Sequence, residues 1–262
     1  MNAEAIRVAP DWLDLRENAD AAARSRELVD DLRNHLPAGP LVVHDLACGA
    51  GAMGRWLAPL LDRTQRWILH DRDPDLLALA AADVAVETRL SDVTQLVPGD
   101  LASADLITAS ALLDLLTGDE LAAVVDACAA AVCPVLFTLS VTGRVALDPA
   151  DPLDPRIAAA FDAHQRRATS RGRLLGPDAV GAAVQAFRRL GAEVTVRQSP
   201  WRLDVAEAGL AAEWLAGWVG AACEQEPALA ADAELYLRRR LRDAEAGRLT
   251  VIVGHADLLV LP

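Results

Sequence analysis

The feature that most constrains this fold is a glycine-rich turn between an apolar run and a helical pattern, which reads Gly49-Ala50-Gly51-Ala52-Met53-Gly54. Glycines permit a tight turn and let the backbone approach a ligand closely. An acidic residue, Asp71, follows about 20 residues later, at the end of the next apolar run, where a carboxylate can accept hydrogen bonds from both ribose hydroxyls. This pattern predicts a site for an adenosine-containing cofactor and leaves NAD open as one choice.

Apolar runs alternate with longer helical patterns along most of the chain. Strands are expected at 41–48, 66–70, 84–90, 105–111, 134–141, 193–198 and 249–260, the last interrupted at 254–257. Helices are expected at 13–36, 52–61, 119–131 and 177–190, and a further helix starts at Pro74. This alternation predicts a mostly parallel sheet with helices on both faces.

Two stretches depart from the alternating pattern. Residues 143–176 contain three prolines and a short helical pattern, and residues 205–246 form a second helical stretch that contains Trp214 and Trp218. A chain of 262 residues suits one large α/β domain or two small ones, and one domain with helical additions is the simplest interpretation. We therefore expect a single domain over 1–262, with an N-terminal helical lid at 1–40, a cofactor-binding core at 41–142, and substrate-side insertions at 143–176 and 205–246.

Asp45 distinguishes between the possible cofactors. A dinucleotide-binding strand is apolar up to its first glycine, whereas Asp45 puts a charge near the end of a strand that should be buried, which is costly unless the charge has a partner. The segment Val-His-Asp-Leu-Ala-Cys-Gly-Ala-Gly at 43–51 resembles the first motif of class I S-adenosylmethionine-dependent methyltransferases. Segments 69–74, 91–93 and 104–110 resemble that family's second motif, its adenine-contacting turn and its fourth strand. The resemblance covers roughly 41–141, 177–198 and 248–260.

The resemblance implies a fold and a set of cofactor contacts. The implied fold is a Rossmann-like, seven-stranded, mostly parallel sheet with an antiparallel C-terminal strand, helices on both faces and helical lid insertions. The implied cofactor is S-adenosyl-L-methionine, with the ribose at Asp71 and the adenine at Asp92 and Val93. The residues expected to bind it are Asp45, Ala47, Gly49, Gly51, Asp71, Arg72, Asp92, Val93, Thr108 and Ser110. Three of these have simpler alternatives, since Asp45 can cap the loop, Asp71 a helix, and Asp92 a turn.

Arg16 is a candidate partner for the cofactor's carboxylate, because arginine binds carboxylates through two hydrogen bonds. The alternative is a solvated surface arginine. Two residues are candidates for a general base that acts on the methyl acceptor, His164 in the first insertion and Asp114 just after the fourth strand. A structural histidine and a solvated carboxylate are the alternatives. Trp201 is a candidate wall of the pocket, with ordinary packing of the lid as the alternative, and His255 is expected to lie away from the pocket.

Charge and cysteine content exclude several functions. All 25 basic residues are arginine, so Schiff-base lysines and P-loop lysines are ruled out. A net charge of −13 argues against a nucleic acid or an anionic membrane as partner. The four cysteines have neither disulfide nor metal-ligand spacing, so we expect no metal and a cytoplasmic location.

Residues 144–173 reverse the overall charge, with six arginines against four aspartates. A basic lid favours an anionic or polyhydroxylated small molecule, and local ion pairing is the alternative explanation. The sequence thus predicts methyl transfer from S-adenosylmethionine to a hydroxyl or carboxyl oxygen of a small molecule. An NAD-dependent oxidoreductase and a non-catalytic S-adenosylmethionine-binding protein are the alternatives.

Overall fold

The computed structural model describes residues 8–81 and 86–262, and its centre is a sheet of eight strands in the order β3-β2-β1-β4-β5-β10-β8, with β9 pairing with β10. The first five strands are parallel and β10 runs antiparallel to its neighbours. The strands are β1 (Leu41–Leu46), β2 (Gln65–Asp71), β3 (Glu87–Leu90), β4 (Leu106–Ser110), β5 (Val135–Asp148), β8 (Glu193–Gln198), β9 (Trp201–Leu203) and β10 (Thr250–Leu261). The predicted Rossmann-like sheet is confirmed, with β9 as an additional strand. The first residues of the strand expected at 84–90 fall outside the described residues.

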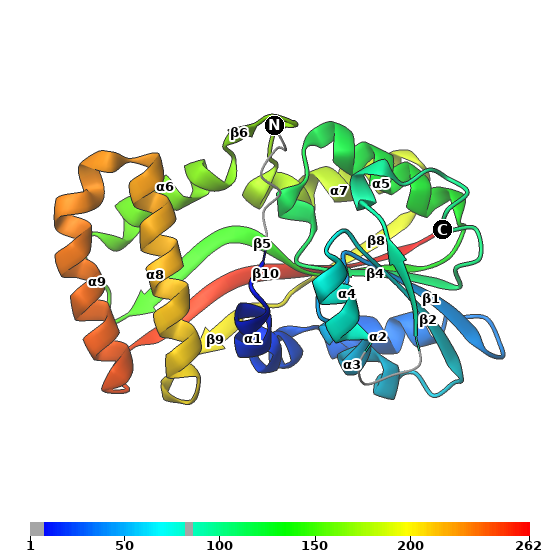
Figure 1. Cartoon of the computed structure of the whole chain (residues 1–262), viewed down its shortest axis with the longest axis horizontal. Helices are drawn as coiled ribbons and strands as arrows, with labels where there is room; N and C mark the ends of the chain where they lie inside the picture. Colours follow the sequence, from blue (N-terminus) through cyan, green and yellow to red (C-terminus); the bar gives the residue numbers. More distant parts are fainter. Residues whose placement is uncertain (1–7, 82–85) are drawn as a thin grey trace.

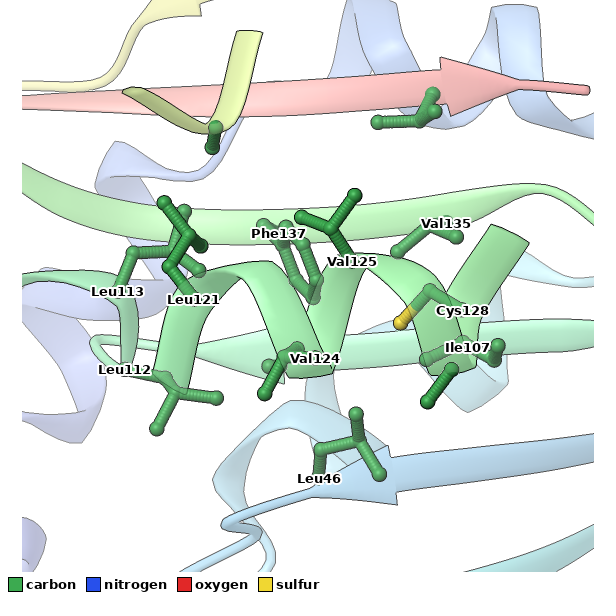
Figure 2. Packing of buried hydrophobic residues seen from close by; sticks show 14 of the residues in the cluster. Leu46, Ile107, Leu112, Leu113, Leu121, Val124, Val125, Cys128, Val135 and Phe137 are labelled. Atoms are coloured by element: carbon green, nitrogen blue, oxygen red, sulfur yellow. The ribbon is translucent and has the colours of Figure 1, made fainter. Parts of the chain in front are cut away.

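Alternating side chains on the central strands fill two separate hydrophobic layers. On β4, Ile107 faces α5 (Gly118–Ala130) and α7 (Ala179–Arg189), whereas Leu106 faces the opposite layer. Figure 2 shows α5 packed over the first layer. The second layer is covered by α2 (Arg26–Arg33), α3 (Ala52–Leu57) and α4 (Pro74–Ala80). Both faces of the sheet are therefore buried, as expected for parallel strands.

Strand β5 is longer than the sequence predicted, and β10 has the predicted length without an interruption. The expected interruption at 254–257 is wrong, because β10 is one continuous strand with two register shifts against β5, at 253–255 and 256–258. At the second shift Thr138 and Leu139 lie opposite Asp257 alone, which makes a β-bulge. The Asp257 carboxylate stabilises the bulge by accepting hydrogen bonds from the backbone nitrogens of Leu139 and Ser25, at 2.8 and 2.7 Å.

The far ends of β5 and β10 carry a second hydrophobic core. Helices α6 (Asp154–Gln165), α8 (Ala208–Gln225) and α9 (Ala230–Glu245) pack at these strand ends, away from the parallel strands (Figure 1). The core includes Trp201, Trp214, Trp218 and Tyr236. Residues 143–148 therefore belong to β5 and not to an insertion. Within the described ranges, the helices are all too short or too polar to cross a membrane.

The N-terminal helix predicted at 13–36 is in fact two helices. Helix α1 (Pro10–Ala23) ends at Arg24, and α2 begins after Ser25, whose side chain accepts a hydrogen bond from the Leu28 nitrogen. A serine in this position is a favoured helix N-cap. The break turns α1 toward β9 and the glycine-rich turn, where Leu13 lies 3.3 Å from the position that a Cβ on Gly49 would occupy. Helix α1 therefore covers the site predicted from the sequence.

Candidate active site

A cavity of about 500 Å³ lies at the carboxyl ends of the parallel strands, beneath α1 and beside the second core. This is the edge where ligands bind in open α/β sheets, and the volume is typical of small-molecule sites. Its lining divides into two ends. The polar end includes Ala47, Gly49, Asp71, Arg72, Asp92 and Val93. The other end is mostly apolar and includes Trp12, Leu116, Val141, Phe161, Trp201 and Trp214. Ser110 and Asp114 also line the cavity.

The polar end is organised by Asp71, at the end of β2. Its Oδ2 accepts a hydrogen bond from the Gly49 nitrogen and its Oδ1 accepts one from the Asp73 nitrogen, both at 2.9 Å. Gly49 and Gly51 have φ values of +55° and +85°, a conformation that glycine adopts without strain. The N-cap of α4 is Asp73 and not Asp71, because the Asp73 side chain accepts a hydrogen bond from the Asp75 nitrogen. The carboxylate of Asp71 thus holds the turn in place while it lines the cavity.

Asp92 and Val93 line the same end from the turn that follows β3. The Oδ1 of Asp92 accepts hydrogen bonds from the nitrogen and the hydroxyl of Thr94, at 2.9 and 2.8 Å. This fixes the turn, and the second carboxylate oxygen can take a ligand donor. Ala47 has a φ of +50° just before the glycine-rich turn, and Arg72 is exposed at the mouth of the cavity.

A smaller cavity of about 70 Å³ adjoins the glycine-rich turn, and Asp45 lines it. Asp45 is 0% exposed, and its Oδ1 accepts a hydrogen bond of 2.7 Å from the Thr108 hydroxyl. Its Oδ2 has no hydrogen-bond partner in the described part of the chain. Burial raises the pKa of Asp45 to about 7. Thr108 is not among the described residues that line either cavity, so it acts behind Asp45 and does not reach a ligand.

Arg24 is a site residue that the sequence analysis missed. It is 3% exposed, lines the smaller cavity, and donates a hydrogen bond of 3.1 Å from Nη2 to the Ser110 hydroxyl. Its Nε and Nη1 have no partners among the described residues. Burial lowers the pKa of Arg24, and the nearby Asp20 opposes this shift. The only signal in the sequence was Ser25, whose capping role ends α1 and turns Arg24 inward.

Arg16 lies between the two cavities but is already paired. Its guanidinium donates two hydrogen bonds to Asp20, at 2.9 and 3.1 Å, and stacks 4.9 Å from the centre of the Trp201 ring. The Trp201 indole also donates to Asp20, at 2.9 Å. The structure therefore offers Arg24, and not Arg16, as the arginine with open donors near the glycine-rich turn.

The apolar end contains two polar groups with open hydrogen-bonding positions. Asp114 Oδ1 and His255 Nδ1 are shielded from solvent, and neither has a partner within residues 8–81 and 86–262. Burial raises the pKa of Asp114 to about 6 and lowers the pKa of His255 to about 3. The expectation that His255 lies away from the site is wrong, because the register shift in β10 turns its ring into the cavity beside Trp201.

The structure does not bring His164 to the cavity. His164 lies on α6, where its Nε2 hydrogen-bonds Glu224 at 3.1 Å, and it is not among the described lining residues. The arginines of the same insertion form ion pairs, Arg166 with Asp178 and Arg171 with Glu120, both at 2.6 Å. These contacts support local ion pairing, which was the alternative explanation for the basic segment at 144–173. The pocket-wall role of Trp201 is confirmed.

Comparisons with known proteins agree with this geometry. Residues 43–134 match a family model described as a methyltransferase domain. No curated protein matches the sequence. The chain is similar to cyclopropane synthase MmaA2 from Mycobacterium tuberculosis, at 14% identity over 97% of this chain and 95% of that one, with a TM-score of 0.50. It is also similar to a protein from Anaeromyxobacter dehalogenans described as a candidate type II methyltransferase, at 20% identity over 90% and 95%, with a TM-score of 0.51.

The strand order and the domain match agree with each other. Residues 43–134 match a methyltransferase domain, and the similar structures share the Rossmann-like fold of the chain. The similar structures share the fold at low identity, so the acceptor has to be inferred from this chain's own residues.

Proposed function

We propose that this enzyme transfers the methyl group of S-adenosylmethionine to an oxygen atom of a small-molecule acceptor. One observation carries the proposal: Arg24 and Asp45 are buried together at the glycine-rich turn, with atoms that lack partners in the described part of the chain. The amino-acid end of the cofactor carries one carboxylate and one ammonium group. Arg24 can donate to the carboxylate and Asp45 can accept from the ammonium, and each contact would satisfy an atom that is costly to leave unpaired.

The rest of the cofactor fits the polar end of the larger cavity. Asp71 has lone pairs left for the ribose hydroxyls after holding the glycine-rich turn, and Asp92 and Val93 line the part where the adenine would lie. Ala47, Gly49 and Ser110 complete this lining, and Arg72 borders its mouth. When bound, S-adenosylmethionine supplies an electrophilic methyl group on its sulfonium sulfur. The protein's part is to align the acceptor with that methyl group and to exclude water.

The proposed acceptor is a small molecule because the cavity has the volume of a small-molecule site and is bordered by α1 and the second core. Asp114 supports an oxygen acceptor, since a partly buried carboxylate with a pKa of about 6 can take the proton of a hydroxyl group. The net charge of −13 disfavours nucleic acid as the acceptor. We further propose that residues 1–262 form one domain, and that the four free cysteines belong to a cytoplasmic protein.

Isothermal titration calorimetry with S-adenosylhomocysteine and with NAD tests the cofactor. The proposal predicts that S-adenosylhomocysteine binds and NAD does not, and tight binding of NAD alone would overturn it. Catalysis is tested with radiolabelled S-adenosylmethionine and an extract of small metabolites. Transfer of label to a small molecule is expected, whereas cofactor binding without any transfer would favour a non-catalytic binding protein.

A further inference from the structure

The apolar end of the larger cavity is built mainly from aromatic and aliphatic side chains. Trp12, Phe161, Trp201 and Trp214 come from four different segments, and Leu116, Leu139, Val141 and Val253 fill the spaces between them. Aromatic walls bind flat ligands well, because ring pairs gain energy beyond the area they bury. A sugar or another strongly hydrated molecule would lose its water against these walls with few hydrogen bonds in return.

The charges at this end also disfavour an anionic ligand. The cationic groups that line it are Arg16 and Arg171, and their carboxylate partners are Asp20 and Glu120. His255 is uncharged at neutral pH, because burial and, to a smaller extent, the charge of Arg16 lower its pKa to about 3. Among the described lining residues of this end, no cation lacks a carboxylate partner.

Asp114 and His255 provide the polar contacts of this end. Asp114 lies four residues after Ser110, so it is close in the chain to the part of β4 that borders the cofactor. Arg16 influences the pKa of Asp114 and the pKa of His255, so it lies within electrostatic range of each, and both residues line the same cavity. A hydroxyl between Asp114 and His255 can donate to the carboxylate, and it accepts from the imidazole in the tautomer that carries the ring proton on Nδ1.

We propose that the methyl acceptor is an uncharged, flat aromatic alcohol, whose ring packs between the tryptophans and whose hydroxyl lies between Asp114 and His255. This inference rests on the proposed methyl transfer and names the class of its acceptor. The acceptor oxygen bonds to the methyl carbon as the carbon–sulfur bond breaks, with the bonding electron pair left on sulfur. The hydroxyl proton passes to Asp114, which later releases it to water. The products are an aryl methyl ether and the neutral thioether form of the cofactor.

Three probes test the acceptor class on the complex with S-adenosylhomocysteine. They are 2-naphthol, its anionic counterpart 2-naphthoate, and glucose, and binding is followed by quenching of tryptophan fluorescence. We expect 2-naphthol to bind about tenfold or more tightly than 2-naphthoate, and glucose not to bind. With S-adenosylmethionine, 2-naphthol should give 2-methoxynaphthalene. Equal or tighter binding of 2-naphthoate or glucose would overturn the inference, as would the absence of 2-naphthol binding to a protein that binds S-adenosylhomocysteine.

Asp114→Asn tests the proton acceptor. It should lower kcat for 2-naphthol by about 10²–10⁴-fold and change the affinity for 2-naphthol little. For the wild type, kcat/KM should rise with pH through about 6, because Asp114 must lose its proton first, and this rise should be absent in the variant. The charged or titratable groups that share the cavity with Asp114 are Arg16 of α1, His255 of β10 and Arg171, with Asp71, Arg72, Asp73 and Asp92 at the opposite end. An unchanged kcat and an unchanged pH profile would exclude Asp114 as the base.

His255→Leu tests the second polar contact. It should weaken 2-naphthol binding by about tenfold, the effect of one lost hydrogen bond, and leave S-adenosylhomocysteine affinity unchanged. The control is His35→Gln, at an exposed histidine on the other side of the sheet from α5, which should change neither value. If His255→Leu does not fold, the comparison of 2-naphthol with 2-naphthoate on the wild type still decides the acceptor class.

Discussion

At the scale of single residues, the site depends on buried polar groups with hydrogen-bonding positions left open. Asp45 could be recognised from sequence, because a carboxylate in an apolar strand stands out. Arg24 could not, because the chain contains many arginines and burial is decided by the break between α1 and α2. Arg16 looked equivalent in sequence, yet Asp20 four residues later in the same helix pairs with it.

We predict that Arg24→Met weakens the binding of S-adenosylhomocysteine by about 10- to 100-fold, the effect of lost hydrogen bonds to a charged group. Methionine keeps most of the packing against Trp56. The affinity for 5′-methylthioadenosine, which lacks the amino-acid end, should stay the same. Both affinities can be measured by calorimetry.

The matched comparison is Arg16→Met. It should change S-adenosylhomocysteine affinity less than Arg24→Met, because Asp20 already uses the Arg16 donors. If Arg16→Met weakens S-adenosylhomocysteine binding more than Arg24→Met does, then Arg16, and not Arg24, binds the carboxylate of the cofactor. Equal losses for both ligands in Arg24→Met would mean that Arg24 only supports the fold.

At the scale of elements, β1 and β2 are joined by a pair of buried histidines, His44 and His70. His44 Nδ1 and His70 Nε2 lie 3.0 Å apart, and Ser103 and Ser91 hydrogen-bond the outer nitrogens at 3.2 Å. Burial lowers the pKa of each histidine to about 4. Burial therefore favours the neutral form of both rings, and two protonated rings could not share the hydrogen bond between them.

We predict that this pair makes stability fall at acidic pH. Between pH 6.5 and about 4 the unfolded chain binds protons that the folded chain does not, so the free energy of unfolding decreases as the pH falls. The free energy of unfolding should be fully recovered above pH 6.5. Thermal melting followed by circular dichroism from pH 8 to pH 4 measures the dependence.

The double substitution of His44 and His70 by glutamine should reduce the slope of melting temperature against pH in this range. His35→Gln is the control, because that side chain is exposed and should leave the slope unchanged. Identical slopes for the wild type and the double variant would show that other groups cause the acid sensitivity.

At the scale of the whole molecule, β5 and β10 join two groups of helices, each of which covers a hydrophobic core (Figure 1). The cavity is lined by residues of both cores. The second core is connected across its helices by Arg240 of α9, which is 3% exposed. Arg240 donates to Asp154 at the start of α6, at 2.7 and 2.8 Å, and to the Pro149 carbonyl, at 2.6 Å. Tyr236 also donates to Asp154, at 2.6 Å.

We predict that Arg240→Met lowers the free energy of unfolding by about 3–5 kcal/mol, because it leaves Asp154 without its buried cationic partner. The control is Arg238→Met on the same helix, where an exposed pair with Glu234 should contribute less than about 1 kcal/mol. Urea denaturation measures both values. Similar losses in the two variants would mean that the buried contacts do not hold α9 in place.

The sequence predicted the residues at the polar end of the cavity better than those at its apolar end. The residues of the polar end follow neighbouring strands at short spacings in the sequence, namely the turn at 49–54, Asp71 and Asp92. Their positions can therefore be predicted from the local pattern of strands and turns. The apolar end brings together Trp12, Trp201 and His255, which are distant in sequence and meet because β10 is long and shifted in register. His164 was a plausible base by residue type alone, and its position on α6 pairs it with Glu224 instead.

A crystal structure with S-adenosylhomocysteine tests the proposed site most directly. We predict that the adenosine lies beside Asp71 and Asp92, the carboxylate contacts Arg24, the ammonium contacts Asp45, and the sulfur faces the apolar end that Asp114 lines. A ligand bound elsewhere, or one whose carboxylate points away from Arg24, would contradict this assignment of the cavity.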